Sequence, residues 1–93
     1  MSPKYGIIHN PDELGALARA HRKSRHLTLA DTAGVGGTGT RFLSELERGK
    51  PTAQLGKTLE TLRLLGLEVA VVPRGMADRI QAIVDESPET GRD

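Results

Sequence analysis

Apolar residues recur along most of the chain at the three- and four-residue spacing of amphipathic helices. The pattern predicts one helix that begins at Pro11, a second that begins at Leu29 and a third over residues 40–48. It also predicts a fourth helix that ends at Gly66 and a further one over residues 76–86. The pattern changes over residues 67–72, where valines partly alternate with other residues and Pro73 ends the run. The sequence therefore predicts a mainly α protein of four to five helices with one short strand near the C-terminal end.

Residues that favour helix ends support these boundaries. Asn10 precedes Pro11 and Glu13, which is typical of a helix N-terminus with a capping-box-like pattern. Thr28 and Thr52 are the candidate N-caps of the second and fourth helices. Gly49 suits the position after the third helix, because glycine tolerates the left-handed conformation that often ends one. Four glycines in residues 34–39 predict a short or frayed second helix.

The core is expected to be aliphatic, because the chain has one Tyr, one Phe and no Trp. The apolar stripe of the first helix is Leu14, Leu17, Ala18 and His21, with His21 half-buried. The stripe of the fourth helix is Leu55, Leu59, Leu62 and Leu65. Four basic residues of the first helix are expected outside this stripe: Arg19, Arg22, Lys23 and Arg25. They either contact the phosphates of a nucleic acid or form a solvent-exposed helix face.

Two short helices lie between two longer ones, which is the layout of a helix-turn-helix unit. In such a unit the second short helix enters the DNA major groove, so one of its sides must be polar and the other must pack. Leu43 and Leu46 are expected to face inward. The residues expected to face outward are Gly39, Thr40, Arg41 and Ser44. Arginine can bond guanine through two hydrogen bonds, and the helix start at Thr28 offers backbone N–H groups to a phosphate.

Residues 10–72 resemble the Cro/CI-type (XRE) helix-turn-helix family and, more narrowly, the HipB-like antitoxins. The matching blocks are residues 11–15, 22–23, 27–28 and 41–52, continuing through Leu62 and residues 65–69. The resemblance implies a homodimeric repressor that binds a palindromic operator in double-stranded DNA. It also implies a bacterial, cytoplasmic, nucleoid-associated protein whose partner is a HipA-like serine/threonine kinase toxin.

The resemblance and the residue chemistry together assign sites. DNA contacts are expected at Lys23, Thr28, Leu29, Gly39, Thr40, Arg41, Ser44 and Lys50. The strand would pair with its copy across the two-fold axis of a dimer, because a strand without a partner in its own chain needs one. Its dimerisation residues are Leu67, Val69, Val71 and Val72. At this family position Glu47 is expected in an internal ion pair or hydrogen bond.

The domain limits follow from these assignments. An N-terminal arm covers residues 1–9, the helix-turn-helix domain residues 10–66, and the dimerisation strand residues 67–73. Residues 74–93 form an amphipathic segment and a tail, of which residues 87–93 are expected to be disordered. The apolar stripe of this segment is Met76, Ile80, Ile83 and Val84. It is a candidate toxin-binding surface, and it can equally pack on the domain or fold only on binding.

Three positions depart from the family pattern and leave two other functions open. Leu29 stands where Gln is usual, Thr32 where Leu is usual, and Gly39 where a polar capping residue is common. One alternative is a stand-alone XRE-type regulator without a toxin. The other is a protein-interaction module whose degenerate helix-turn-helix no longer binds DNA.

Charge and size indicate the kind of partner and the number of domains. Residues 1–52 carry eight Lys and Arg against five Asp and Glu, a net charge of +3, and residues 53–93 have a net charge of −2. A basic front half favours an anionic partner. The 93 residues suffice for one small domain, and no apolar run approaches the ~20 residues of a membrane span. The N-terminus also lacks the apolar core of a signal peptide.

Catalytic and cofactor sites are not expected. The absence of Cys excludes disulfides and thiolate metal sites, and no His has further ligands at metal-binding spacing. No nucleophile motif is present, so the chain is not expected to be an enzyme. Residues 34–39 match G-x-G-x-x-G, with Glu60 downstream, but a dinucleotide site needs a preceding strand and a βαβ unit that the sequence does not predict.

Overall fold

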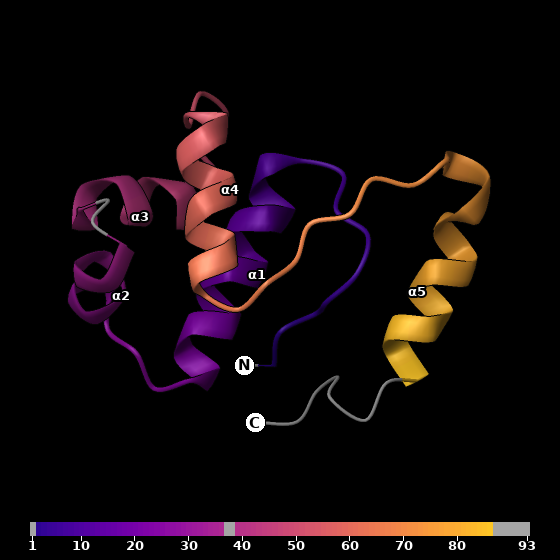
Figure 1. Cartoon of the computed structure of the whole chain (residues 1–93), viewed down its shortest axis with the longest axis horizontal. Coiled ribbons are helices and arrows are strands. Elements are labelled where there is room, and N and C mark those ends of the chain that lie inside the picture. The colour runs from indigo at the N-terminus through magenta and orange to yellow at the C-terminus, as the bar shows by residue number, and fades with distance from the viewer. Residues whose placement is uncertain (1, 37–38, 87–93) are drawn as a thin grey trace.

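The computed structural model describes residues 2–36 and 39–86. Its elements are α1 (Pro11–Ser24), α2 (Leu29–Gly36), α3 (Thr40–Glu47), α4 (Leu55–Leu64), the 3-10 turn η1 (Arg74–Met76) and α5 (Ala77–Glu86). The predicted mainly α fold of four to five helices is confirmed, and the described residues contain five. Helices α1 to α4 gather into one body, and α5 lies apart from it (Figure 1). None of the helices in the described ranges is long and apolar enough to cross a membrane.

The predicted helix starts are confirmed for α1 and α2. Asn10 Oδ1 accepts a hydrogen bond from the Glu13 N–H (2.9 Å), and Thr28 Oγ1 accepts one from the Asp31 N–H (3.0 Å). The Asp31 carboxylate accepts in return from the Thr28 N–H (3.1 Å), which completes a capping box. Helix α2 is short, as predicted, with eight residues.

The predicted end of α3 is also confirmed, whereas the predicted cap of α4 is wrong. Gly49 follows α3 with a φ of +83°, a conformation that favours glycine. Helix α4 begins at Leu55, after Gln54 rather than after Thr52. The turn that follows α3 continues further than expected, since the Ala53 N–H still donates to the Lys50 carbonyl (3.3 Å). Thr52 lies inside that turn.

The core lies between α1, α2, α3 and α4. Its buried apolar residues are Ala18, Ala20, Ala33, Leu43, Leu46 and Leu62. Helices α1 and α3 approach closely at Gly15, where a Cβ would collide with the carbonyl oxygens of Leu46 and Glu47. Close packing here depends on glycine because no other residue leaves the α3 backbone enough room.

The predicted stripe of α4 is only partly right. Leu62 is buried, but Leu55 and Leu59 are 70% and 43% exposed. Thr58 and Thr61 are buried in their place. The helix is therefore rotated about its axis, so that its inward face is centred between the threonines and Leu62 and part of the leucine stripe stays at the surface.

His21 is more buried than predicted, with 2% exposure instead of a half-buried position. Its Nε2 lies 2.7 Å from the Leu65 carbonyl, and its Nδ1 lies 2.8 Å from the Tyr5 hydroxyl. Because a carbonyl only accepts, Nε2 donates, and Nδ1 of the neutral ring accepts from Tyr5. One imidazole thus joins the N-terminal arm, α1 and the end of α4.

The N-terminal arm also holds α5. Gln81 of α5 accepts a hydrogen bond from the Ile7 N–H (2.8 Å) and donates one to the Tyr5 carbonyl (3.0 Å). Gly6 lies between them with a φ of +127°, where a Cβ would collide with the Gln81 side chain. In Figure 1 the arm and residues 67–73 run between the helical body and α5.

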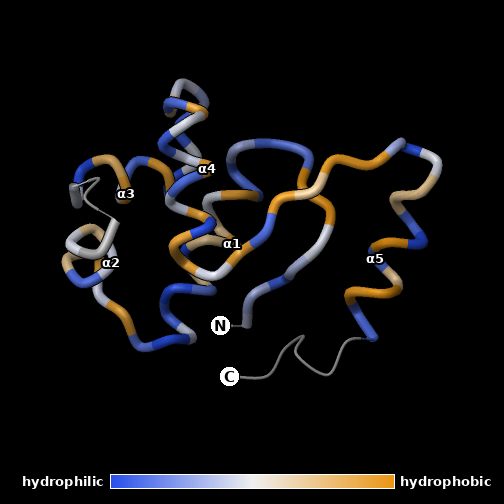
Figure 2. Tube along the Cα trace, viewed as in Figure 1, coloured by the Kyte–Doolittle hydropathy of each residue, from blue (hydrophilic) through white to orange (hydrophobic). Residues whose placement is uncertain are grey.

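Residues 67–73 form no strand with any other part of the described chain. The segment is hydrophobic along much of its length (Figure 2), and Val69 and Val71 are 52% and 96% exposed. A strand needs hydrogen-bonding partners, and a single copy offers none at this position. The expected pairing across a dimer therefore stays a prediction, and the expected disorder of residues 87–93 concerns a segment outside the described residues.

Candidate nucleic-acid interface

A hollow at the junction of α1, α2 and α3 brings together four of the predicted DNA contacts. These are Lys23, Thr28, Leu29 and Ser44. The cations Arg19 and Arg48 and the imidazole of His26 line the same hollow. Lys23, Arg19 and Arg48 are exposed and form no ion pair with a described residue. The hollow therefore combines positive charge with hydroxyl groups, which suits a phosphate backbone.

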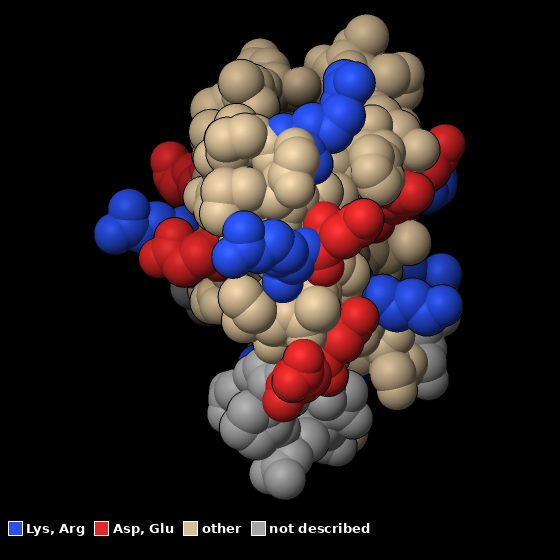
Figure 3. All heavy atoms as spheres, turned by 90° about the vertical axis from the view of Figure 1, so that its right-hand side faces the viewer, with Lys and Arg blue, Asp and Glu red and all other residues tan. Residues whose placement is uncertain are grey.

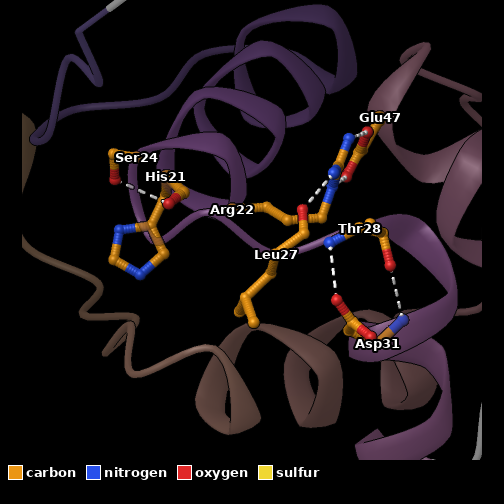
Figure 4. Close-up of polar contacts among 7 residues, drawn as sticks. All are labelled: His21, Arg22, Ser24, Leu27, Thr28, Asp31 and Glu47. Atoms are coloured by element: carbon orange, nitrogen blue, oxygen red, sulfur yellow. Dashed lines mark hydrogen bonds and ion pairs between the residues drawn. The ribbon is translucent and has the colours of Figure 1, made fainter.

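The floor of the hollow is a buried ion pair between α1 and α3. Arg22 Nε and Nη2 donate to the two Glu47 carboxylate oxygens (2.6 and 3.0 Å), and Arg22 Nη1 donates to the Leu27 carbonyl (2.6 Å). The two side chains are 7% and 5% exposed. The hydrogen bond to Glu47 raises the pKa of Arg22. Figure 4 shows the guanidinium between the carboxylate and the α1–α2 turn.

This pair confirms one prediction and corrects another. Glu47 forms the expected internal ion pair. Arg22 was expected off the core with its basic neighbours and is instead 6% exposed. Periodicity places residues by their Cα positions, whereas a long arginine side chain can reach back to a buried carboxylate. The pair fixes α1, α3 and the residue before Thr28 relative to one another.

Thr28 caps α2 at the edge of the hollow. Its hydroxyl oxygen and its N–H both bond Asp31, as Figure 4 shows. The hydrogen bond from the Thr28 N–H, and then that with the hydroxyl, lowers the pKa of Asp31. The Thr28 hydroxyl oxygen accepts from the Asp31 N–H, which places the hydroxyl at the N-terminal end of α2, in the lining of the hollow.

The two sides of α3 are those predicted. Leu43 and Leu46 are 0% and 3% exposed. Thr40 and Arg41 are exposed, and Ser44 is half-buried at the edge of the hollow. Gly39 precedes the helix with a φ of +84° and makes no side-chain cap. This backbone conformation favours glycine and accounts for its place where a polar cap is common.

A carboxylate lies between two of the predicted contacts, Arg41 and Lys50. Glu45 Oε1 is 3.2 Å from Lys50 Nζ, and Glu45 Oε2 is 3.7 Å from Arg41 Nε. The hydrogen bond from Lys50, supported by the charges of Lys50, Arg41 and Arg48, holds the pKa of Glu45 below its usual value. Glu45, His26 and Arg48 were not among the residues predicted to contact DNA. The spacing of Arg41 and Glu45, four residues apart on one helix, is the signal that could have identified Glu45.

The opposite end of the molecule has a different charge pattern. Figure 3 looks onto the α5 side and shows acidic and basic side chains interspersed among uncharged ones. In residues 2–36 and 39–86 no three His, Asp or Glu lie close enough to hold a metal ion. Helix α2 stands where a dinucleotide fingerprint requires a strand, and part of that motif, residues 37 and 38, lies outside the described chain.

Comparison with known proteins places this arrangement in a family. The chain is 46% identical over 68 residues to an uncharacterized HTH-type transcriptional regulator, y4mF, of Sinorhizobium fredii, and the match covers 73% of this chain and 90% of the relative. The chain belongs to the HTH-type transcriptional regulators. No protein-family model matches it.

Solved structures with the same fold include two HipB complexes. A HipB–O4 20mer complex matches with a TM-score of 0.70 and 18% identity, over 75% of this regulator and 99% of that chain. A HipB variant in an O2 20mer complex matches with a TM-score of 0.70 and 20% identity, over 75% and 97% of the two chains. A structure named MDT Protein matches with a TM-score of 0.69 and 18% identity, over 75% and 99%. The fold of this regulator is therefore HipB-like, as its sequence motifs predicted.

Proposed function

We propose that this regulator is a homodimeric repressor that binds a palindromic operator through α3 and acts as the antitoxin of a HipA-like kinase. In this division residues 10–66 bind DNA, residues 67–73 join two copies, and residues 74–93 bind the kinase. The N-terminal arm, residues 1–9, links these parts through Tyr5. It docks on His21 of α1 and on Gln81 of α5.

The observation that carries DNA binding is the combination of an exposed polar face on α3 with a cationic hollow beside it. Thr40 and Arg41 are exposed and face away from the body, because the other side of α3 packs in the core. Arg41 would bond a guanine, and Ser44 would contact a base or a phosphate. Lys23 and Thr28 in the hollow would hold the phosphate backbone, which fixes the register of α3.

Dimerisation is supported by apolar surface that one copy leaves uncovered. Val69 and Val71 lie on a segment with no strand partner, and Leu59 and Leu64 of α4 are 43% and 48% exposed. Exposed apolar groups of this kind are typical of interfaces between chains. Two copies paired through residues 67–73 would present two α3 helices to half-sites ~34 Å apart, or a multiple of this distance.

Kinase binding rests on α5. Its packing within the described chain is limited: Ile83 is 66% exposed and Met76, in the preceding turn, is 40% exposed. Ile80 and Val84 are half-buried. This arrangement leaves one apolar side of the helix available to a partner while the Gln81 hydrogen bonds attach the other side to the arm.

Selection of duplexes from a random pool tests the DNA-binding part. The dimer should enrich a palindrome with a fixed half-site spacing. Arg41→Ala should weaken binding to the enriched duplex by ~1–3 kcal/mol and relax the preference at one base position per half-site. Unchanged affinity and unchanged preference would contradict the placement of α3 in the groove.

Co-expression with a neighbouring kinase-like reading frame tests the antitoxin part. Growth arrest by the kinase, relieved by the full chain and not by an Ile83→Asp variant, is the expected result. Sequence-selective DNA binding with no kinase partner would favour a stand-alone regulator. A stable dimer without any sequence preference would favour an interaction module. The supporting observation is the buried Thr32 hydroxyl, which has no hydrogen-bond partner among the described residues.

A further inference from the structure

The position of Glu45 is unexpected for a helix that enters DNA. Its carboxylate lies on the polar side of α3, within reach of two of the cations expected to contact the operator. The distances are 3.7 Å to Arg41 and 3.2 Å to Lys50. The side chain is 24% exposed, whereas that of Arg41 is 92% exposed. A negative charge so placed opposes the approach of a phosphate backbone.

The carboxylate also occupies the cations that DNA needs. Each of its oxygens faces one cation, so both Arg41 and Lys50 must leave or share Glu45 when they turn to guanine or phosphate. When these cations leave, the partly buried Glu45 carboxylate needs replacement hydrogen-bond donors at the protein–DNA boundary. In the major groove the amino group of cytosine can donate this hydrogen bond to a carboxylate.

We propose that Glu45 is a specificity-determining residue: it holds Arg41 and Lys50 back from arbitrary DNA and releases them where a cytosine amino group replaces them. The proposal rests on the proposed operator binding. Glu45 lowers the affinity for every duplex through its charge, and a cytosine at the facing position relieves that cost. Discrimination thus arises from a repulsive group as well as from attractive contacts.

The test compares the full chain with Glu45→Gln and with the control variant Glu86→Gln. Both substitutions remove one negative charge from an acidic helical residue and keep its shape. Glu86 is exposed at the end of α5, on the opposite side of the arm from α3 (Figure 1). Thermal denaturation of the three proteins establishes that each is folded to the same extent.

Two duplexes are used: one enriched by the wild-type protein from a random pool and one scrambled version of it. Glu45→Gln should bind the scrambled duplex ~3- to 10-fold more tightly near 0.1 M salt. Its plot of log affinity against log salt should be steeper by ~0.9, as for one more effective phosphate contact. Its gain on the enriched duplex should be smaller, so the ratio of the two affinities should fall.

A second selection with Glu45→Gln gives an independent readout. Duplexes enriched by the wild type should contain a C·G pair at one position per half-site that is no longer enriched by the variant. Equal behaviour of Glu45→Gln and Glu86→Gln on both duplexes would overturn the role of Glu45 while leaving operator binding intact. Absence of any enriched sequence with the wild-type protein would instead refute the proposed operator binding itself.

Discussion

The buried pair of Arg22 and Glu47 should contribute much of the cohesion between α1 and α3. Replacing Arg22 by Met keeps an unbranched side chain but leaves the Glu47 carboxylate, 5% exposed, without a counter-charge. Breaking a buried pair in this way typically costs ~3–5 kcal/mol. A small domain has a total free energy of unfolding of only ~5–15 kcal/mol. Arg22→Met should therefore lose about a fifth or more of that stability.

The double variant Arg22→Met/Glu47→Leu should recover part of the loss. It removes both charges and leaves only the Leu27 carbonyl without the guanidinium that donates to it at 2.6 Å. An unsatisfied buried acceptor costs ~1–3 kcal/mol. The double variant should thus be destabilised by about that amount, and less than the Arg22→Met single variant.

Urea denaturation followed by circular dichroism measures these values, at one protein concentration because dimerisation adds to the apparent stability. Arg41→Ala is a suitable control, since Arg41 is 92% exposed and its substitution should change stability little. A loss below ~1 kcal/mol for Arg22→Met would mean that the pair is solvated in solution. If the double variant lost the sum of the losses of Arg22→Met and Glu47→Leu, the two side chains would not interact.

Three further predictions concern other parts of the body. Thr61→Val should raise the free energy of unfolding by ~1 kcal/mol or more, since the buried Thr61 hydroxyl has no hydrogen-bond partner in the described chain. A lower free energy of unfolding for Thr61→Val in urea denaturation would mean that the hydroxyl has a partner in solution. Gly15→Ala should lower the melting temperature, because a Cβ would collide with the α3 carbonyls at a cost of ~1–3 kcal/mol that exceeds the gain in helix propensity. The Asp31 capping box should add stability that is complete above pH 3.8, the ordinary Asp value, and is lost as the pH falls through the lowered pKa of Asp31. An Asp31→Asn variant keeps an acceptor for the Thr28 N–H, and its pH titration should lack that acid-dependent loss.

Local sequence signals predicted the helices well because their causes are local. The caps at Asn10 and Thr28 bond N–H groups three residues away, and the left-handed Gly49 ends α3 through its own backbone. The inward and outward sides of α3 follow from 3.6-residue periodicity alone. These features need no knowledge of the rest of the chain.

The remaining features depend on tertiary contacts that periodicity does not describe. The burial of Arg22 requires Glu47, 25 residues later, and the burial of His21 requires Tyr5 and Leu65. The rotation of α4 follows from the shape of the core rather than from its own leucines. The hollow likewise joins residues of three helices, so only some of its members, and not their proximity, were predictable from sequence.

The most direct test of operator binding is retardation of the DNA upstream of the regulator's own gene, compared with a scrambled duplex across a salt series. The proposed function predicts that the upstream duplex is retarded at physiological salt at protein concentrations that leave the scrambled duplex free. It also predicts that the affinity for both duplexes falls steeply as salt rises. Equal, weak and salt-labile binding to the two duplexes would contradict sequence recognition by α3.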